Sequence, residues 1–222
     1  MNQPRLLDFM CKAGGAAKGY QLAGFYVVGV DIEPQPHYCG DEFYQADALT
    51  YPLGDYDAYH ASPKCERFSQ CVHPSKLSKQ IRALNPDQIT PMRERLLSTG
   101  KPFIIENVPG APLQNFVKLD GTMFGLTTIK ERWFECHGFE IPILRTPPFN
   151  ADGLVKAGKF AGIMRHGKNS GELTRREHLA AAYHIDWFMN REELREAIPP
   201  EYTKFIGKYL MEVVSGVEKG IE

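Results

Sequence analysis

The sequence lacks several features that would assign it to a class at once. Its 222 residues carry 26 basic and 27 acidic side chains, so the net charge of −1 neither indicates nor excludes a nucleic-acid partner. No apolar run approaches the roughly 20 residues that a membrane-spanning helix needs. The N-terminus shows no signal-peptide pattern, so we expect a cytoplasmic protein without membrane contact. Internal repeats and low-complexity tracts are also missing, which argues against a solenoid.

Cysteine is scarce as well. The chain has five, at Cys11, Cys39, Cys65, Cys71 and Cys136, an odd number without CxxC spacing. This pattern argues against a disulfide framework and against a zinc finger, and it favours a reducing compartment. We therefore predict no metal site.

The N-terminal third has the pattern of a doubly wound α/β sheet. An apolar strand is expected at 5–10, a helix of small residues at 16–23, and a second apolar strand at 25–30 that ends at Asp31. A strand, a glycine turn, a helix and a strand ending in an acid begin such a sheet. Length and composition fit one α/β domain.

The remaining elements are expected as follows. Strands are predicted at 44–48, 56–60 and 103–105 and within 123–135, and helices at 91–99, 173–183, 191–197 and 199–214. Thr174 and Glu177 have the spacing of a capping box. The polar stretch 70–81 is expected to be a loop, and the aperiodic stretch 144–171 is the candidate insertion.

The first turn and two acids indicate a cofactor site. Gly14 and Gly15 let the backbone approach a ligand, and the helix N-terminus that follows favours anions, although glycines here also serve packing. Asp31 lies at the end of the second strand, where an acid commonly accepts hydrogen bonds from ribose hydroxyls. Asp47 follows another short strand. Together they predict an adenosine-containing cofactor. NAD is the rival, although the spacing is not GxGxxG.

Cys65 follows Pro63 in a short turn after the strand at 56–60. Lys64 and Arg67 beside it would lower the pKa of the thiol and favour a nucleophilic thiolate. The alternative is a solvated loop face, and the other four cysteines are expected to be small buried hydrophobes.

An acid and an amide end a later apolar strand. Glu106, followed by Asn107 and Val108, can hold the ring nitrogen and exocyclic amine of a pyrimidine, or it can form a strand-end salt bridge. Lys130 and Arg132 alternate, so they are predicted to share one strand face, where they hold a phosphate or base carbonyl or simply meet solvent.

In this order the motifs resemble those of the cytosine-5 DNA methyltransferases, over nearly the whole chain. Asp8-Phe-Met-Cys-Lys-Ala-Gly-Gly15 is similar to the cofactor motif, and Ser62-Pro-Lys-Cys-Glu66 to the nucleophile motif. Glu106-Asn-Val108 matches its motif unchanged, and Thr128-Ile-Lys-Glu-Arg132 and Phe205-Ile-Gly-Lys208 resemble two later motifs. The likeness is greatest to short phage-type members.

The resemblance implies a Rossmann-like fold, S-adenosylmethionine as donor and DNA as partner, in a phage-infected or prophage-bearing cell. It implies a catalytic domain at 1–140 and 173–222 and a reduced target-recognition insertion at 141–172; a monomer is expected. Catalytic roles are implied for Cys65, Glu106 and Arg132. Cofactor contacts are implied for Asp8, Met10, Lys12, Gly14, Gly15, Asp31, Ile32, Asp47, Ala48, Pro63 and Lys208, and substrate contacts for Ser62, Lys64, Glu66, Asn107, Val108 and Lys130.

The chain departs from the family at Met10, Lys12, Lys64, Glu66 and Lys208. If the three lysines converge, a carboxylated analogue of S-adenosylmethionine is an alternative donor; otherwise Glu66 offsets a lysine. A same-fold enzyme acting on a nucleotide and a non-catalytic DNA-binding decoy also remain open. The presence of both the cysteine and the acid argues against the decoy.

Overall fold

The computed structural model describes residues 2–68, 84–145, 155–156 and 175–216. Cys71, Thr174, the predicted loop at 70–81 and most of the predicted insertion lie outside the described residues.

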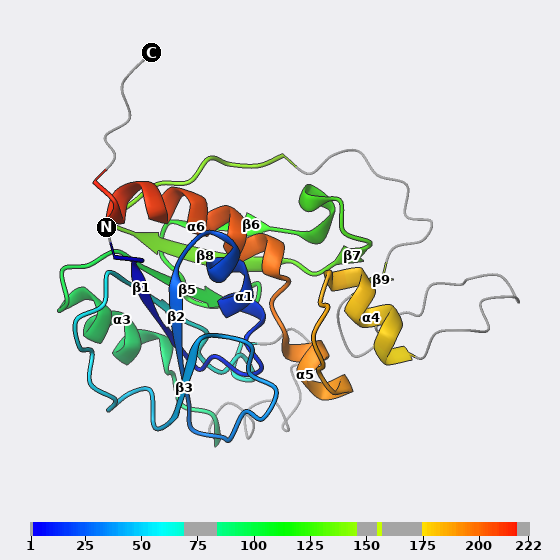
Figure 1. Cartoon of the computed structure of the whole chain (residues 1–222), viewed down its shortest axis with the longest axis horizontal. Helices are drawn as coiled ribbons and strands as arrows, with labels where there is room; N and C mark the ends of the chain where they lie inside the picture. Colours follow the sequence, from blue (N-terminus) through cyan, green and yellow to red (C-terminus); the bar gives the residue numbers. More distant parts are fainter. Residues whose placement is uncertain (1, 69–83, 146–154, 157–174, 217–222) are drawn as a thin grey trace, which may run out of the picture.

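A seven-stranded sheet in the order β3-β2-β1-β4-β5-β8-β6 forms the centre of the molecule (Figure 1). The first five strands in this order are parallel, and β8 runs antiparallel to β5 and β6. Because the chain starts in mid-sheet and builds outward in both directions, the predicted doubly wound fold is confirmed. The strands are β1 (Arg5–Phe9), β2 (Tyr26–Asp31), β3 (Glu42–Gln45), β4 (Ala58–Ala61), β5 (Phe103–Asn107), β6 (Phe116–Leu119) and β8 (Arg132–His137).

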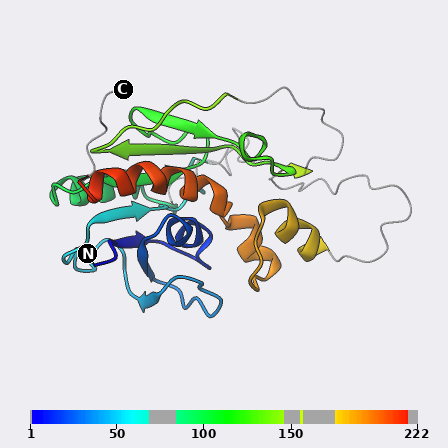
Figure 2. The same ribbon diagram turned by 45° about the horizontal axis from the view of Figure 1, so that its top comes forward.

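Helices cover both faces of the sheet. α1 (Gly15–Leu22) and α6 (Pro200–Val214) lie side by side on one face, and α3 (Ile89–Leu97) lies on the other (Figures 1 and 2). Successive strand residues alternate between the two layers: Leu6 packs with α1 and α6, and Leu7 with α3. Burial on both faces explains why these strands read as continuous apolar runs.

The C-terminal part joins the beginning of the chain. α4 (Arg175–Tyr183) and α5 (Arg191–Glu196) share a buried cluster with Ala13, in the turn before α1. Thr203 of α6 donates a hydrogen bond to the Ala16 carbonyl at 2.8 Å. The N-terminal end of α6 is therefore held against the start of α1.

Two predictions about local structure need correction. The stretch 123–135 is not one strand: it contains the end of the 3-10 helix η1 (Gly121–Phe124), the short β7 (Thr128–Ile129) and the start of β8. β7 pairs with β9 (Val155–Lys156) in a separate small sheet, so the chain leaves the main sheet before Lys130. The edge strand β6 was not predicted. The strand expected at 44–48 is β3, which begins two residues earlier, at Glu42.

Candidate active site

Most of the predicted site residues gather at one edge of the sheet. The carboxyl ends of β1, β2, β4 and β5 meet there, and antiparallel β8 begins there. In open α/β sheets ligands bind outside these strand ends. The edge brings together Asp8 and the 10–15 turn, Asp31, the 62–66 loop, Glu106 and Arg132.

The turn after β1 has an unusual backbone. Met10 and Lys12 adopt positive φ values of 59° and 49°, a region that non-glycine residues rarely occupy. Gly14 has φ 87°, and a Cβ there would lie 2.8 Å from the Cys39 sulfur. A Cβ on Gly15 would lie 2.5 Å from the Ile198 carbonyl oxygen. Both glycines thus have a packing reason, in addition to the predicted cofactor role.

Asp8 is a buried acid without a partner. Its side chain has no exposed surface, and neither carboxylate oxygen has a hydrogen-bond partner among the described residues. Burial raises its pKa well above the usual value, and the charges of Asp31 and Glu106 raise it further. Buried polar groups of this kind are rare and need a partner. An ammonium or hydroxyl group of a ligand would supply one, which fits the predicted cofactor.

Asp31 is fixed by the backbone. Its two carboxylate oxygens accept hydrogen bonds from the amides of Lys12, at 3.1 Å, and Glu33, at 3.0 Å. Carboxylate oxygens have lone pairs to spare, so ribose hydroxyls can still be bound. Ile32 beside it is 59% exposed, Asp47 is exposed with one oxygen bonded to the Leu49 amide, and Ala48 is buried.

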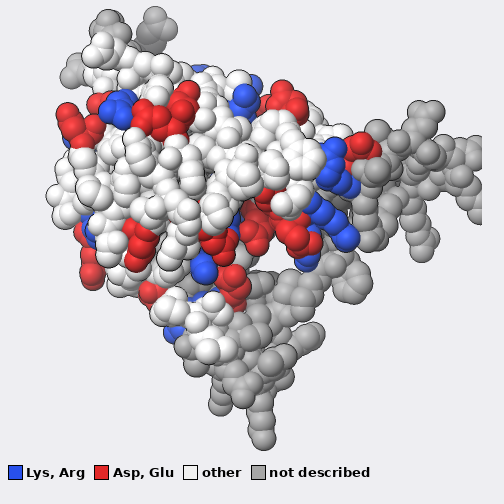
Figure 3. All heavy atoms as spheres, turned by 60° about the horizontal axis from the view of Figure 1, so that its bottom comes forward, with Lys and Arg blue, Asp and Glu red and all other residues white. Residues whose placement is uncertain are grey.

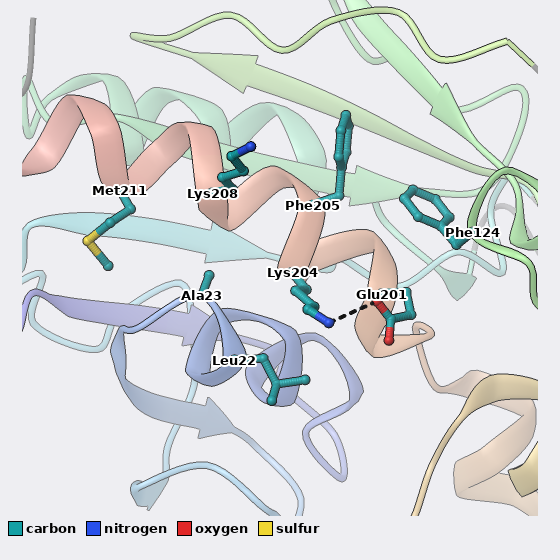
Figure 4. Close-up of a pocket in the computed structure, with 8 residues that line it drawn as sticks. All are labelled: Leu22, Ala23, Phe124, Glu201, Lys204, Phe205, Lys208 and Met211. Atoms are coloured by element: carbon teal, nitrogen blue, oxygen red, sulfur yellow. Dashed lines mark ion pairs between the residues drawn. The ribbon is translucent and has the colours of Figure 1, made fainter.

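Lys208 lies apart from the other two lysines, whereas Lys12 and Lys64 both lower the pKa of Glu33. The Lys12 ammonium pairs with Glu33 at 3.0 Å and Glu196 at 3.6 Å, not with Glu66. Lys208 lines a hollow of about 510 Å³ together with Leu22, at the far end of α1 from Lys12 (Figure 4). An eight-residue helix is about 12 Å long, so the expected convergence is wrong. A second hollow runs along β6 and includes Leu119 and Glu131.

The cysteine loop is anchored to the end of β5. The side-chain Nδ2 of Asn107 donates a hydrogen bond to the Pro63 carbonyl at 2.8 Å, and the side-chain Oδ1 accepts one from the backbone N–H of Val108 at 2.9 Å. The Lys64 amide donates to Gln88 at 3.2 Å. Asn107 is 1% exposed, so the structure gives it an anchoring contact rather than open space toward a substrate.

The Cys65 thiol is not activated in the way the sequence predicted. Its pKa is raised, first by desolvation beside the strand ends and then by the charges of Glu106 and Glu66; Arg132 lowers it. Desolvation acts although the residue as a whole is exposed. Arg67, expected to lower the pKa, donates instead to the Asn85 carbonyl at 3.1 Å. The thiol therefore needs a change in its surroundings before it ionises readily.

Glu106 and Arg132 form a buried ion pair. Arg132 Nε lies 3.0 Å from Glu106 Oε1, and their side chains are 17% and 7% exposed. Burial raises the pKa of Glu106, while Arg132, Lys130 and a hydrogen bond from Ser62 lower it. Burial is the largest of these effects, so the pKa of Glu106 is raised on balance.

Lys130 is placed differently from the prediction. It precedes β8 and is 1% exposed, so it does not share a solvent-facing strand face with Arg132. Its ammonium donates to the Arg195 carbonyl at 2.9 Å and lies 4.5 Å from the centre of the Tyr183 ring. These contacts hold α4 and α5 beside the start of β8.

Sequence reasoning missed His60, which lies inside β4 and has no exposed surface. A polar residue within an apolar strand was the available signal.

On the surface, acidic and basic side chains are interspersed, with acidic ones gathered at a hollow (Figure 3). No broad basic field covers the described part of this face.

Comparison with known proteins identifies the fold. No family model and no curated protein matches the chain. The Entamoeba histolytica methyltransferase EhMeth aligns over 96% of this chain and 99% of its own, with a TM-score of 0.63 and 9% identity. The chain therefore shares the fold of this methyltransferase.

Two other solved structures align over a smaller share. A candidate DNA modification methyltransferase from an E. coli prophage has 18% identity and a TM-score of 0.44, over 63% of this chain and 49% of its own. The S. pombe Dnmt2 methyltransferase has 17% identity and a TM-score of 0.39, over 60% and 48%. The chain spans about half the length of these two proteins.

Proposed function

We propose that the protein is a cytosine-5 DNA methyltransferase, a short member of that family, with S-adenosylmethionine as donor. The observation that carries the proposal is the contact between Asn107 and the Pro63 carbonyl. One buried amide links the loop of the cysteine to the strand that ends in the acid. A nucleophile and an acid held in register at the strand ends are what addition to a pyrimidine ring needs.

The raised pKa of the Cys65 thiol depends on the charge of Glu106. The ionised Glu106 carboxylate is one cause of the raised thiol pKa. When Glu106 is protonated, that cause disappears and the thiol ionises more easily. Protonated Glu106 is also the form that can give a proton to the ring. Protonation of Glu106 therefore favours both the attack by Cys65 and the proton transfer to the ring.

In the proposed reaction the target cytosine is flipped out of the duplex. The Cys65 thiol gives its proton to water, and the thiolate sulfur bonds to C6. The C5–C6 electron pair moves to C4–C5, the C4–N3 pair moves to N3, and N3 takes the proton of Glu106. S-adenosylmethionine, when bound, would supply the methyl group to C5 and be left as S-adenosylhomocysteine. The C5 proton then leaves to a water-borne base, the sulfur–C6 bond breaks, the double bond returns, and Glu106 regains the N3 proton. Arg132 balances the Glu106 carboxylate while the proton is on the ring and lies beside the base carbonyl.

The cofactor would be held by the turn after β1 and the end of β2. The orphaned Asp8 carboxylate suits the amino group, and Asp31 suits the ribose hydroxyls. Ile32 and Asp47 would flank the adenine. Because Lys208 lies at the other end of α1, we take the donor to be S-adenosylmethionine itself rather than a carboxylated analogue.

Target recognition would fall to the short segment 141–172. So small an insertion offers few side chains to read base edges, and its basic residues suit phosphate contacts. We propose a short or relaxed recognition site and strongly salt-dependent binding.

Mass spectrometry of nucleosides tests the proposal. The protein is incubated with S-adenosylmethionine and, in separate arms, duplex DNA or deoxycytidine nucleotides. The proposal expects 5-methylcytosine from DNA alone and none from Cys65→Ser or Glu106→Gln. Product from the nucleotide arm alone would indicate a nucleotide enzyme. DNA binding without product would indicate a decoy.

A further inference from the structure

A chain of polar groups runs from α1 to Glu106. The Tyr20 hydroxyl lies 2.9 Å from His60 Nδ1, and His60 Nε2 lies 2.9 Å from the Ser62 hydroxyl. Ala61 pairs with Ile105 in the parallel register of β4 and β5, so Ser62 and Glu106 occupy the next, neighbouring positions. A hydrogen bond from Ser62 is one of the causes that lower the pKa of Glu106. Tyr20 and His60 have no exposed surface. This hydrogen-bond chain therefore crosses the core from α1 to Glu106.

The direction of the hydrogen bonds follows from counting hydrogens. Burial lowers the pKa of His60 to about 3, so the imidazole carries one proton at neutral pH. Within the described part of the chain, Tyr20 has no acceptor other than His60 Nδ1. If Tyr20 donates there, the imidazole proton sits on Nε2 and points to Ser62, whose own hydrogen points to Glu106. The reverse direction would leave the buried Tyr20 hydrogen unbonded, which is unfavourable.

We propose that Tyr20, His60 and Ser62 are positioning residues that aim Glu106 and stabilise its carboxylate once its proton has moved to the substrate ring. The inference rests on the role of Glu106 in the proposed function. A hydroxyl donates more strongly to a carboxylate than to a neutral carboxyl group. The hydrogen-bond chain therefore stabilises the ionised Glu106 that exists after proton transfer more than the protonated Glu106 that exists before it.

Several charged groups face Glu106 from other elements. Arg132 at the start of β8 and Lys130 before it favour the carboxylate. The Glu106 charge in turn raises the pKa of Asp8 on β1 and of the Cys65 thiol. None of these four residues belongs to the hydrogen-bond chain, so substitutions within that chain leave the ionic surroundings of Glu106 in place.

The experiment is a carbon-13 NMR titration of protein labelled at the glutamate carboxyl carbons. The resonance that is lost in Glu106→Gln belongs to Glu106. A hydrogen bond to a charged group predicts that Ser62→Ala raises the pKa of Glu106 by about one to two units. Tyr20→Phe, which deletes only the first hydroxyl, should shift it in the same direction by less. Ser62→Thr keeps a hydroxyl and should restore the wild-type value.

Activity gives the second readout. Ser62→Ala should lower kcat about tenfold or more with little change in KM, because the lost hydrogen bond acts after substrate is bound. It should also move the pH optimum upward, because the pKa of the acid Glu106 is raised. Unchanged Glu106 titration in folded Ser62→Ala and Tyr20→Phe proteins would overturn the inference. If the wild-type protein titrates as described but transfers no methyl group, the proposed function is overturned, whereas the inference about the hydrogen-bond chain stays supported.

Discussion

Replacing Arg132 by methionine removes the ionic partner of a buried carboxylate. The two charged groups lie 3.0 Å apart, and Glu106 is 7% exposed, so water cannot take the place of the guanidinium. Breaking a buried pair by removing one partner costs about 3–5 kcal/mol. Lys130 stays nearby and offsets part of the charge. We therefore expect Arg132→Met to lower the free energy of unfolding by about 3 kcal/mol at pH 8.

The cost should depend on pH with a definite sign. Burial raises the folded-state pKa of Glu106, and the loss of Arg132, the first of the groups that lower it, raises it further. An acid with a raised folded pKa contributes stability below its unfolded pKa, about 4.3, and loses it as pH rises through the folded pKa. The destabilisation by Arg132→Met should therefore be largest at pH 8 and shrink as the pH falls and Glu106 takes up a proton.

Urea unfolding at pH 8, 6.5 and 5 measures this dependence. Arg195→Met is the matched control, because Arg195 pairs with Glu192 at 2.8 Å on the surface, with 41% and 71% exposed side chains. It should cost less than about 1 kcal/mol at every pH. Equal costs of Arg132→Met at pH 5 and pH 8, or a cost like that of the control, would refute the reasoning.

Three further predictions concern the same edge of the sheet. Lys12 has φ 49°, so Lys12→Gly should be about 1 kcal/mol more stable than Lys12→Ala in urea unfolding; equal stability would show that the turn is unstrained. Asp8→Asn should weaken S-adenosylhomocysteine binding in calorimetry about tenfold or more, a loss of ~1.4 kcal/mol, because the amide cannot balance an ammonium; an unchanged Kd contradicts the fit. Because the charge of Glu106 raises the thiol pKa, Cys65 in Glu106→Gln should react with iodoacetamide at lower pH than in wild type, as followed by peptide mass mapping. Superimposable pH profiles would disprove that coupling.

Much of the fold could be predicted because its signals are local. The apolar runs at β1 and β2, the glycine turn between them and Asp31 at the end follow one another in the sequence. The broken stretch around Lys130 could not be predicted, because its course depends on pairing between β7 and β9 and on contacts with Tyr183 and Arg195.

The site was predictable as a set of residues but not as an electrostatic environment. Cys65 was judged by Lys64 and Arg67, its neighbours in sequence, whereas its pKa depends on burial and on Glu106, from a strand that begins far along the chain. The same limit applies to His60, whose partners Tyr20 and Ser62 meet only after folding. Sequence order says which groups are present, and the fold decides which of them act on one another.

The central claim is covalent catalysis by Cys65, and trapping on 5-fluorocytosine DNA tests it most directly. Fluorine at C5 blocks the loss of the C5 substituent, so an attacking cysteine stays bonded to C6. The account predicts that, with S-adenosylmethionine present, peptide mass mapping finds a methylated fluorocytosine adduct on Cys65, and that Cys65→Ser forms none. An adduct on another residue such as Cys71, or 5-methylcytosine formed by Cys65→Ser, would contradict it.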